Sequence, residues 1–202
     1  RPFLVLQLTH AGRCSNPGGR RVIKAACANP HLDEPETPMA MWRDEELDTL
    51  RDVFIDRIRV AAEAGFDAVD IKACHGYLVG ELLGAHARSD SRYGGVFENR
   101  CRFLLDIVAG ARDRAPGARI AVRLGASDLV PYPYGFGMAT DGSESIDLAE
   151  PRTLVRELVA RGCCLINVSA GVPRHAPHIG RPFDRPAKGN AEAPEHPLVS
   201  EA

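Results

Sequence analysis

The sequence lacks several features that mark particular classes of protein. Its 6 cysteines form no CxxC pair and no other metal-ligand spacing, and a chain of 202 residues needs no disulfide bonds to hold a core. No apolar run is long enough to cross a bilayer, and no charged-then-apolar signal segment opens the chain. The 25 basic and 27 acidic residues are mixed, which leaves no basic stripe and no acidic tail. We therefore expect a cytoplasmic protein with reduced thiols that binds no metal, nucleic acid or membrane.

What is present is a core and a repeating order of elements. Hydrophobic residues make up 45% of the chain, so residues 1–202 can form a single domain, and no linker divides them. Four short apolar runs predict strands at residues 4–8, 66–72, 119–124 and 165–169. Apolar residues at steps of three and four predict helices at residues 44–64, 97–114 and 150–161. This alternation of strand and helix is typical of parallel βα units.

Alternation within the predicted strands separates an apolar face from a polar one. The apolar, helix-facing set is Leu4, Leu6, Leu8, Val69, Ile71, Ile120, Val122, Leu124, Ile166 and Val168. The opposite set is Val5, Gln7, Asp70, Lys72, Ala121, Arg123, Asn167 and Ser169. A doubly wound sheet would be apolar on both faces, whereas the inner face of a (β/α)8 barrel ends in a polar mouth. The predicted fold class is therefore α/β, a partial TIM (β/α)8 barrel with about four of the eight parallel βα units.

Four stretches carry a resemblance to a known family. They are QLTHAGR at residues 7–13, GFDAVDIKACHGYL at 65–78, RYGGVFENR at 92–100 and VRLGASD at 122–128. In this order and spacing they resemble successive signatures of the Old Yellow Enzyme family (NADH:flavin oxidoreductase / NADH oxidase) of FMN-dependent enzymes. The likeness corresponds to barrel strands three to six, so we expect an internal piece, truncated at both ends, of an FMN-binding TIM barrel. Such a piece would lack the loops after strands seven and eight, which commonly hold the cofactor phosphate in this fold.

The resemblance implies a role for four polar residues. Gln7 matches a glutamine that hydrogen-bonds the pyrimidine edge of the flavin. Arg123 matches an arginine near flavin N1, whose charge stabilises the reduced ring. Tyr77 matches a tyrosine that protonates the substrate carbon alpha to the activating group, while flavin N5 delivers hydride to the beta carbon. His75 matches the second member of a His/Asn or His/His pair that hydrogen-bonds the substrate's carbonyl or nitro oxygen.

Lys72 departs from the family pattern, because a histidine usually holds the first position of that pair. An ammonium group polarises a carbonyl or pairs with a substrate carboxylate, so this residue raises the chance of a different, anionic substrate. A structural interpretation stays open, in which Lys72 forms an ion pair with Asp70 on the same strand face. Gln7 and Arg123 would then fill a polar layer of the barrel. Tyr77 would simply pack at the start of a helix.

The expected function is that of an FMN-dependent NAD(P)H oxidoreductase acting on a small molecule. The pyridine nucleotide would reduce the flavin, which would then reduce an activated C=C bond of enone or enoate type. Two alternatives stay open. One is oxidative demethylation of a small amine, as in trimethylamine dehydrogenase, and the other is a non-catalytic truncated fragment. A half barrel exposes two sheet edges, which favours a homo-oligomer.

Overall fold

The computed structural model describes residues 1–19, 23–34 and 37–177. Its main element is a parallel sheet of four strands in the order β1-β4-β5-β6. These strands are β1 (Val5–Leu8), β4 (Ala68–Ala73), β5 (Ile120–Gly125) and β6 (Leu165–Ser169). A second, small parallel pair, β2 (Ile23–Ala25) and β3 (Met39–Met41), lies between β1 and the first long helix. The parallel α/β class and the four predicted strands are therefore confirmed.

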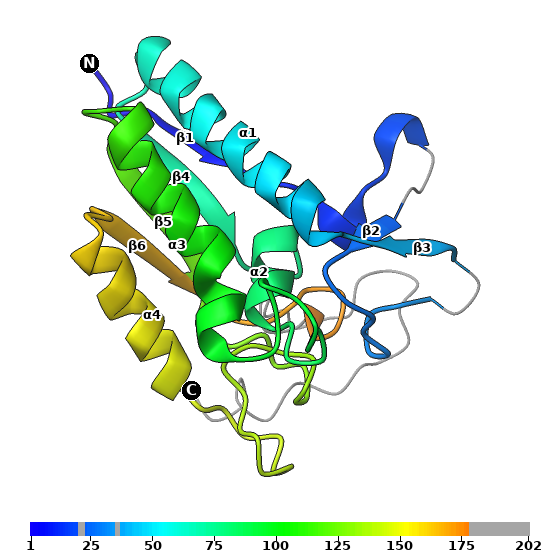
Figure 1. The fold of residues 1–202 in the computed structure, drawn as a ribbon. Coiled ribbons are helices and arrows are strands. Elements are labelled where there is room, and N and C mark those ends of the chain that lie inside the picture. Colours follow the sequence, from blue (N-terminus) through cyan, green and yellow to red (C-terminus); the bar gives the residue numbers. More distant parts are fainter. Residues whose placement is uncertain (20–22, 35–36, 178–202) are drawn as a thin grey trace, which may run out of the picture.

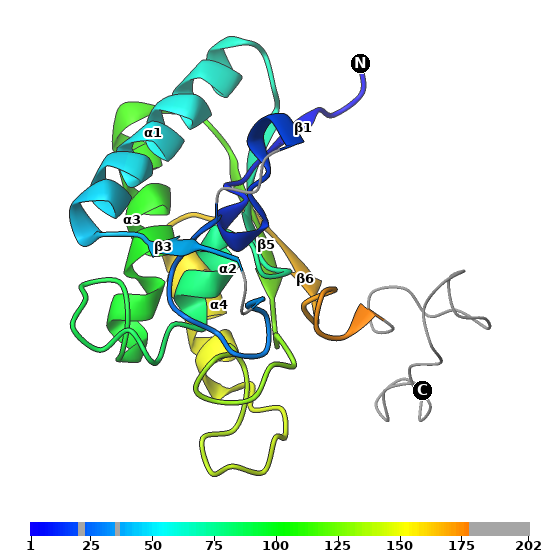
Figure 2. The same cartoon turned by 90° about the vertical axis from the view of Figure 1, so that its right-hand side faces the viewer.

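Three long helices cover one face of the sheet, as Figures 1 and 2 show. They are α1 (Asp44–Glu63), α3 (Phe97–Arg114) and α4 (Ala149–Ala160). The predicted bounds agree for α3 and differ by one residue at one end of α1 and at both ends of α4. The short helix α2 (Leu78–Leu83) had no predicted range, although one interpretation placed Tyr77 at a helix start. Two 3-10 turns, Gly12–Cys14 and Pro17–Gly19, were not predicted.

Local sequence explains how α1 begins and ends. Its first turn carries three acidic residues, which favour the positive end of the helix dipole. Glu46 accepts a hydrogen bond from the Arg43 backbone N–H at 2.9 Å and so satisfies a group at the helix start. Gly65, directly after the helix, has a φ of 88°, a left-handed conformation in which glycine suffers no Cβ clash. The chain then turns into β4.

The core lies between the sheet and the three long helices. Of the predicted helix-facing residues, five are buried in it: Val69, Ile71, Ile120, Val122 and Leu124. Leu6, Leu8 and Ile166 pack against it while only partly buried. Burying one such side chain stabilises the fold by roughly 1.5–3 kcal/mol.

Two residues of the predicted apolar face are exposed instead. Leu4 is 45% exposed and Val168 is 63% exposed. Leu4 precedes β1 and Val168 belongs to β6, and both of these strands are sheet edges with a neighbour on one side only. The predicted burial is therefore wrong at these two positions, because burial also needs a neighbouring element over each strand.

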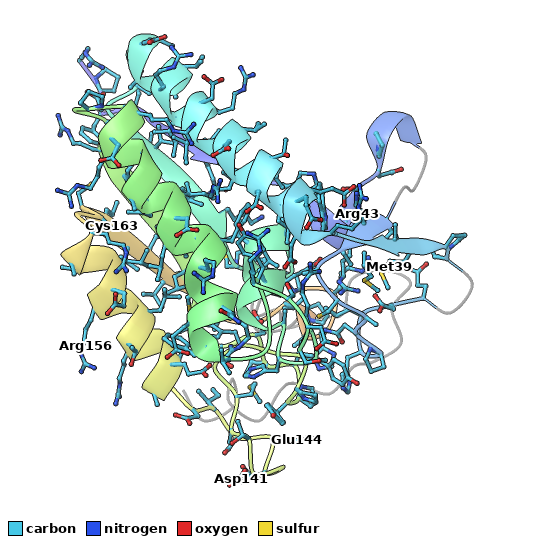
Figure 3. The ribbon with its side chains drawn as sticks, viewed as in Figure 1. Met39, Arg43, Asp141, Glu144, Arg156 and Cys163 are labelled. Atoms are coloured by element: carbon cyan, nitrogen blue, oxygen red, sulfur yellow. The ribbon has the colours of Figure 1, made fainter. Side chains whose placement is uncertain are left out.

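No described helix covers the opposite face of the sheet, which is visible edge-on in Figure 2. Figure 3 shows Met39 at the start of β3, Arg43 shortly after that strand, and Asp141 and Glu144 on the loop after β5. Across residues 1–19, 23–34 and 37–177, none of the helices combines the length and hydropathy of a membrane span. The uncovered face and the loops at its C-terminal end therefore hold the candidate site.

Candidate active site

Strand register brings the predicted polar residues into two rows across the uncovered face. Gln7 on β1 lies opposite Asp70 on β4. Toward the C-terminal ends of the strands, Lys72 on β4 lies opposite Arg123 on β5, and Arg123 lies opposite Asn167 on β6. Residues paired in register on neighbouring strands project from the same side of a sheet. The predicted grouping of these polar side chains on one face is confirmed.

The Gln7–Asp70 pair forms the lower row, the one farther from the C-terminal ends of the strands. The Gln7 amide Nε2 donates a hydrogen bond to Asp70 Oδ2 at 2.6 Å, and Asp70 is 8% exposed. The other carboxylate oxygen, Oδ1, is buried without a hydrogen-bond partner among the described residues. Since the amide nitrogen faces the carboxylate, the Gln7 carbonyl is left to accept a hydrogen bond from a ligand.

The alternative ion pair between Lys72 and Asp70 is absent from the described residues. The Asp70 carboxylate accepts a hydrogen bond from Gln7 instead. The Lys72 ammonium lies over the ring of Tyr77, with Nζ 3.2 Å from the ring centroid. This is a cation–π contact. Both side chains are half-buried. Burial lowers the pKa of Lys72, and the charge of Arg123 lowers it further. The upper row therefore holds two neighbouring cations.

Arg123 has a buried atom that lacks a partner. Its Nε has no hydrogen-bond acceptor among the described residues, although it is shielded from solvent. An unsatisfied buried donor costs about 1–3 kcal/mol, so such an atom marks a place where a ligand acceptor fits. The electron-rich N1 and carbonyl edge of a reduced flavin is an acceptor of this kind. Arg123 and the free Gln7 carbonyl therefore fit the polar edge of FMN.

The turn after β4 places His75 and Tyr77. His75 has a φ of 62° and Gly76 a φ of 71°, two successive left-handed residues that reverse the chain. A Cβ on Gly76 would lie 2.9 Å from Val172 Cγ1, so this position has no room for a side chain. Tyr77 then serves as the N-cap residue of α2, and the Leu78 N–H donates to the His10 carbonyl at 3.1 Å. The turn is thereby attached to the loop after β1.

Burial lowers the pKa of His75, and the charges of Arg123 and Lys72 lower it further. The imidazole is therefore neutral at pH 7 and donates through one N–H. Burial also raises the pKa of the neighbouring Cys74 thiol, while a hydrogen bond with Ser169 opposes the rise. A thiol of this kind is a poor nucleophile.

Three buried charged residues, which the sequence analysis did not identify as functional, stabilise the loops around the site. Arg13 Nε lies 3.2 Å from Glu81 Oε1, and both side chains are 3% exposed. Glu81 also accepts the backbone N–H groups of Arg13 and Ala26, at 3.0 Å and 2.8 Å. This ties the loop after β1 to α2. Asp128 accepts the Phe136 N–H at 2.9 Å, and burial raises its pKa to about 7.

The sequence carried a signal for two of these residues. Arg13 ends one of the four motif stretches and Asp128 ends another, whereas Glu81 lies in none of them. Charged residues are rarely buried without a partner, and both Arg13 and Asp128 are buried here. Within the described part of the chain, no group of three or more His, Cys, Asp or Glu side chains has the arrangement of a metal site.

Parallel βα units with polar side chains at the C-terminal ends of the strands define the class of TIM-barrel enzymes. Within that class, a model of the NADH:flavin oxidoreductase / NADH oxidase family matches residues 1–159. The chain belongs to this family of FMN-dependent oxidoreductases. The predicted resemblance to Old Yellow Enzyme is confirmed, and so is FMN as the cofactor of the family.

Individual relatives agree with this membership. An NADPH dehydrogenase of Geobacillus sp. (strain WCH70) is 37% identical over 153 residues, which are 71% of this chain and 44% of that protein. A 12-oxophytodienoate reductase-like protein of Arabidopsis thaliana is 37% identical over 149 residues, covering 66% of this chain and 45% of that protein. The chain thus spans less than half the length of these relatives.

Solved structures show the same fold. Old Yellow Enzyme from Pichia sp. AKU4542 superposes with a TM-score of 0.65 at 22% identity, over 81% of this chain and 46% of that one. Morphinone reductase superposes with a TM-score of 0.63 at 24% identity, over 80% of this chain and 46% of that one. The predicted partial barrel is confirmed by both.

Proposed function

We propose that residues 1–202 form one partial FMN-binding barrel domain of an NAD(P)H oxidoreductase that reduces an activated C=C bond. The observation that carries this proposal is the grouping of Lys72, His75, Tyr77 and Arg123 at the C-terminal ends of β4 and β5. Arg123 brings a buried donor without a partner, and Tyr77 brings a phenol at a helix start. These groups supply the charge stabilisation and the proton that such a reduction needs.

When bound and reduced by NAD(P)H, FMN would supply the hydride for the beta carbon of the acceptor. Gln7 and Arg123 would hold its polar edge, the glutamine through its free carbonyl and the arginine through Nε. The neutral His75 donates a hydrogen bond to the acceptor's activating oxygen and stabilises the charge that develops there. The Tyr77 hydroxyl gives its proton to the alpha carbon. Two C–H bonds form, the C=C π bond is lost, and solvent returns a proton to the phenol.

The names of the relatives favour reduction over amine demethylation. Several relatives are described as NADPH dehydrogenases or as 12-oxophytodienoate reductase-like proteins. A tyrosine placed to donate a proton suits the reduction of a C=C bond, because the alpha carbon must gain one. Reduction of a C=C bond is therefore the proposed reaction.

The experiment compares Tyr77→Phe with wild type in the two half-reactions, using the FMN-loaded protein, NADPH and, as acceptors, 2-cyclohexenone and trans-cinnamate. We expect flavin reduction by NADPH to keep its rate, while flavin reoxidation by the acceptor that wild type reduces slows about 10²- to 10⁴-fold, the usual contribution of a positioned general acid. Tyr132→Phe is the matched control, because Tyr132 is an exposed tyrosine whose ring packs edge-to-face with His86.

A second measurement tests cofactor binding directly. Arg123→Leu removes the unpartnered donor, and we expect FMN to bind at least tenfold more weakly by fluorescence quenching. A wild-type protein that takes up no FMN would favour the non-catalytic fragment. Equal slowing of both half-reactions by Tyr77→Phe would remove the phenol from the proposed mechanism.

We also infer that the chain self-associates through its sheet edges. Phe3, Leu4 and Val5 are 58%, 45% and 44% exposed at the β1 edge, and Leu165 and Val168 are 56% and 63% exposed on β6. Exposed strands of this kind pair with strands of other chains. The formal net charge of -2 gives little repulsion between copies.

A further inference from the structure

Lys72 is a cation that the proposed reaction leaves without an anionic partner. Asp70, the nearest carboxylate by strand position, accepts the Gln7 amide instead. No carboxylate of the described residues acts on the Lys72 ammonium, and the charge beside it is that of Arg123. The cation–π contact with Tyr77 offsets part of the hydration that this half-buried ammonium loses, but it does not neutralise the charge. The site as it stands therefore favours an anion.

Arg123 strengthens this preference. It lies opposite Lys72 in the register of β4 and β5, so two positive side chains share one small area. Assigning Arg123 to the flavin, as proposed above, still leaves the charge of Lys72 uncompensated. A neutral carbonyl accepts a hydrogen bond from Lys72 but does not neutralise its charge. A carboxylate does both.

The contact with Tyr77 fixes where that carboxylate would lie. Lys72 Nζ is held 3.2 Å from the centroid of the Tyr77 ring, so the cation and the proton-donating phenol are side by side. In an α,β-unsaturated acid the carboxylate is bonded directly to the alpha carbon, the atom that receives the proton. A group that binds the carboxylate and a group that protonates its neighbour must therefore be adjacent, as Lys72 and Tyr77 are.

The charge that develops in the transition state also favours a carboxylate substrate. When hydride adds to the beta carbon of an enone, one negative charge develops on one oxygen, and neutral donors stabilise it. When hydride adds to an unsaturated carboxylate, the new charge adds to the charge that is already there. Two donors of which one is cationic suit this case, and Lys72 with the neutral His75 is such a pair.

We propose that Lys72 makes this site specific for acceptors with a carboxylate conjugated to the C=C bond, that is, for α,β-unsaturated acids. This rests on the proposed function and narrows its substrate class. Lys72 and His75 bind the two carboxylate oxygens, and Tyr77 protonates the alpha carbon after hydride has reached the beta carbon. The C=C bond becomes a single bond, the reduced cofactor is oxidised by two electrons, and the product leaves as a saturated carboxylate.

Binding and turnover test the inference separately. In the binding experiment, benzoate and its uncharged analogue benzamide are titrated into wild type and Lys72→Met by calorimetry. We expect the variant to bind benzoate at least tenfold more weakly, as the loss of one charge-assisted hydrogen bond implies, and to change benzamide binding less than twofold. Lys72→Arg, which keeps the charge, should restore most of the affinity for benzoate.

Lys24→Met is the matched control. Lys24 also lies over an aromatic ring, 4.4 Å from the centroid of Trp42, but it is paired with Glu46 at 2.6 Å. The same change of side chain there should leave benzoate binding unaltered. Thermal melting of all variants shows whether each one is folded.

In the turnover experiment, the FMN-loaded protein reduces trans-cinnamate or its methyl ester. We expect Lys72→Met to lower kcat/KM for the acid at least tenfold more than for the ester. The inference would be overturned if Lys72→Met lowered kcat/KM equally for the acid and the ester, or if it left the affinity for benzoate unchanged. Neither result would contradict the proposed reaction. Lys72-dependent benzoate binding without turnover of either compound would instead refute the proposed reaction and keep Lys72 as the carboxylate-binding residue.

Discussion

The Gln7 amide donates a hydrogen bond to the Asp70 carboxylate across β1 and β4, at 2.6 Å. This bond has two consequences on the uncovered face of the sheet. It occupies the carboxylate that would otherwise pair with Lys72, and it turns the Gln7 carbonyl away from Asp70. Asp70 is therefore a positioning residue for Gln7 in the proposed flavin site.

The first prediction concerns this bond. Asp70→Leu removes the acceptor and frees the Gln7 amide to rotate, so FMN should bind about five- to tenfold more weakly, the effect of losing roughly 1 kcal/mol. Asp70→Asn is the matched variant, because its side-chain oxygen still accepts the hydrogen bond, and it should bind FMN within about twofold of wild type. Flavin fluorescence quenching measures both. Equal affinities for the Leu and Asn variants would show that Asp70 does not orient Gln7.

The second prediction concerns the left-handed backbone of His75, whose φ is 62°. A residue with a Cβ loses about 1–2 kcal/mol in this conformation, and glycine does not. His75→Gly should therefore be more stable to urea than His75→Ala by about 1 kcal/mol, after the greater flexibility of glycine in the unfolded chain is included.

Both His75 variants lack the imidazole donor, so both should reduce the acceptor about 10²- to 10³-fold more slowly, whatever their stability. Alanine and glycine variants of equal stability would contradict the left-handed assignment at this position. A large difference in activity between them would show that backbone conformation, rather than the lost donor, controls the reaction.

The fold was predictable where a residue pattern and its neighbours act together. The apolar stripe of α3 and the Pro116-Gly117 pair that follows it predicted both bounds of the helix, and the stripe is buried in the core. The pattern failed for α2, which has only six residues and begins at a turn with two left-handed positions. It also failed for β2 and β3, which have only three residues each. These two strands are held together by strand pairing and by a hydrogen bond that the Trp42 indole N–H donates to the Lys24 carbonyl.

The candidate site was predictable to the same degree. Strand alternation placed Gln7, Lys72 and Arg123 on one face, since side-chain direction follows the backbone. The contact between Lys72 and Tyr77 depends on the turn between them, which no periodicity describes. Whether Asp70 pairs with Gln7 or with Lys72 likewise depends on how far each side chain reaches in three dimensions.

The third prediction is a pH dependence of stability. Burial raises the pKa of Asp128 from 3.8 to about 7 in the folded chain. Between these values the unfolded chain ionises this carboxyl and the folded chain does not, so its contribution to stability is present below pH 3.8 and is lost as pH rises toward 7. Asp128→Asn cannot ionise, and its oxygen still accepts the Phe136 N–H.

Relative to wild type, Asp128→Asn should therefore gain stability between pH 5 and pH 8, by at most about 3 kcal/mol. Urea unfolding at the two pH values measures the gain. Asp141→Asn is the control, because Asp141 is an exposed residue of the same loop (Figure 3) whose pKa is lowered by a hydrogen bond with Ser143. Its carboxyl is ionised throughout this range, so its difference from wild type should not change with pH. A flat difference for Asp128→Asn as well would place the Asp128 pKa near its ordinary value.

The last prediction concerns the exposed sheet edges. A lysine on an edge strand opposes strand pairing, because association would desolvate its charge. We expect wild type to have a mass above that of one chain in sedimentation, rising with concentration. The double variant Leu165→Lys with Val168→Lys, on β6, should shift the mass toward that of one chain. Val159→Lys on α4 changes a residue that is 57% exposed but lies outside the sheet, and it should associate like wild type. A wild-type chain that stays monomeric at every concentration would contradict association through the edges.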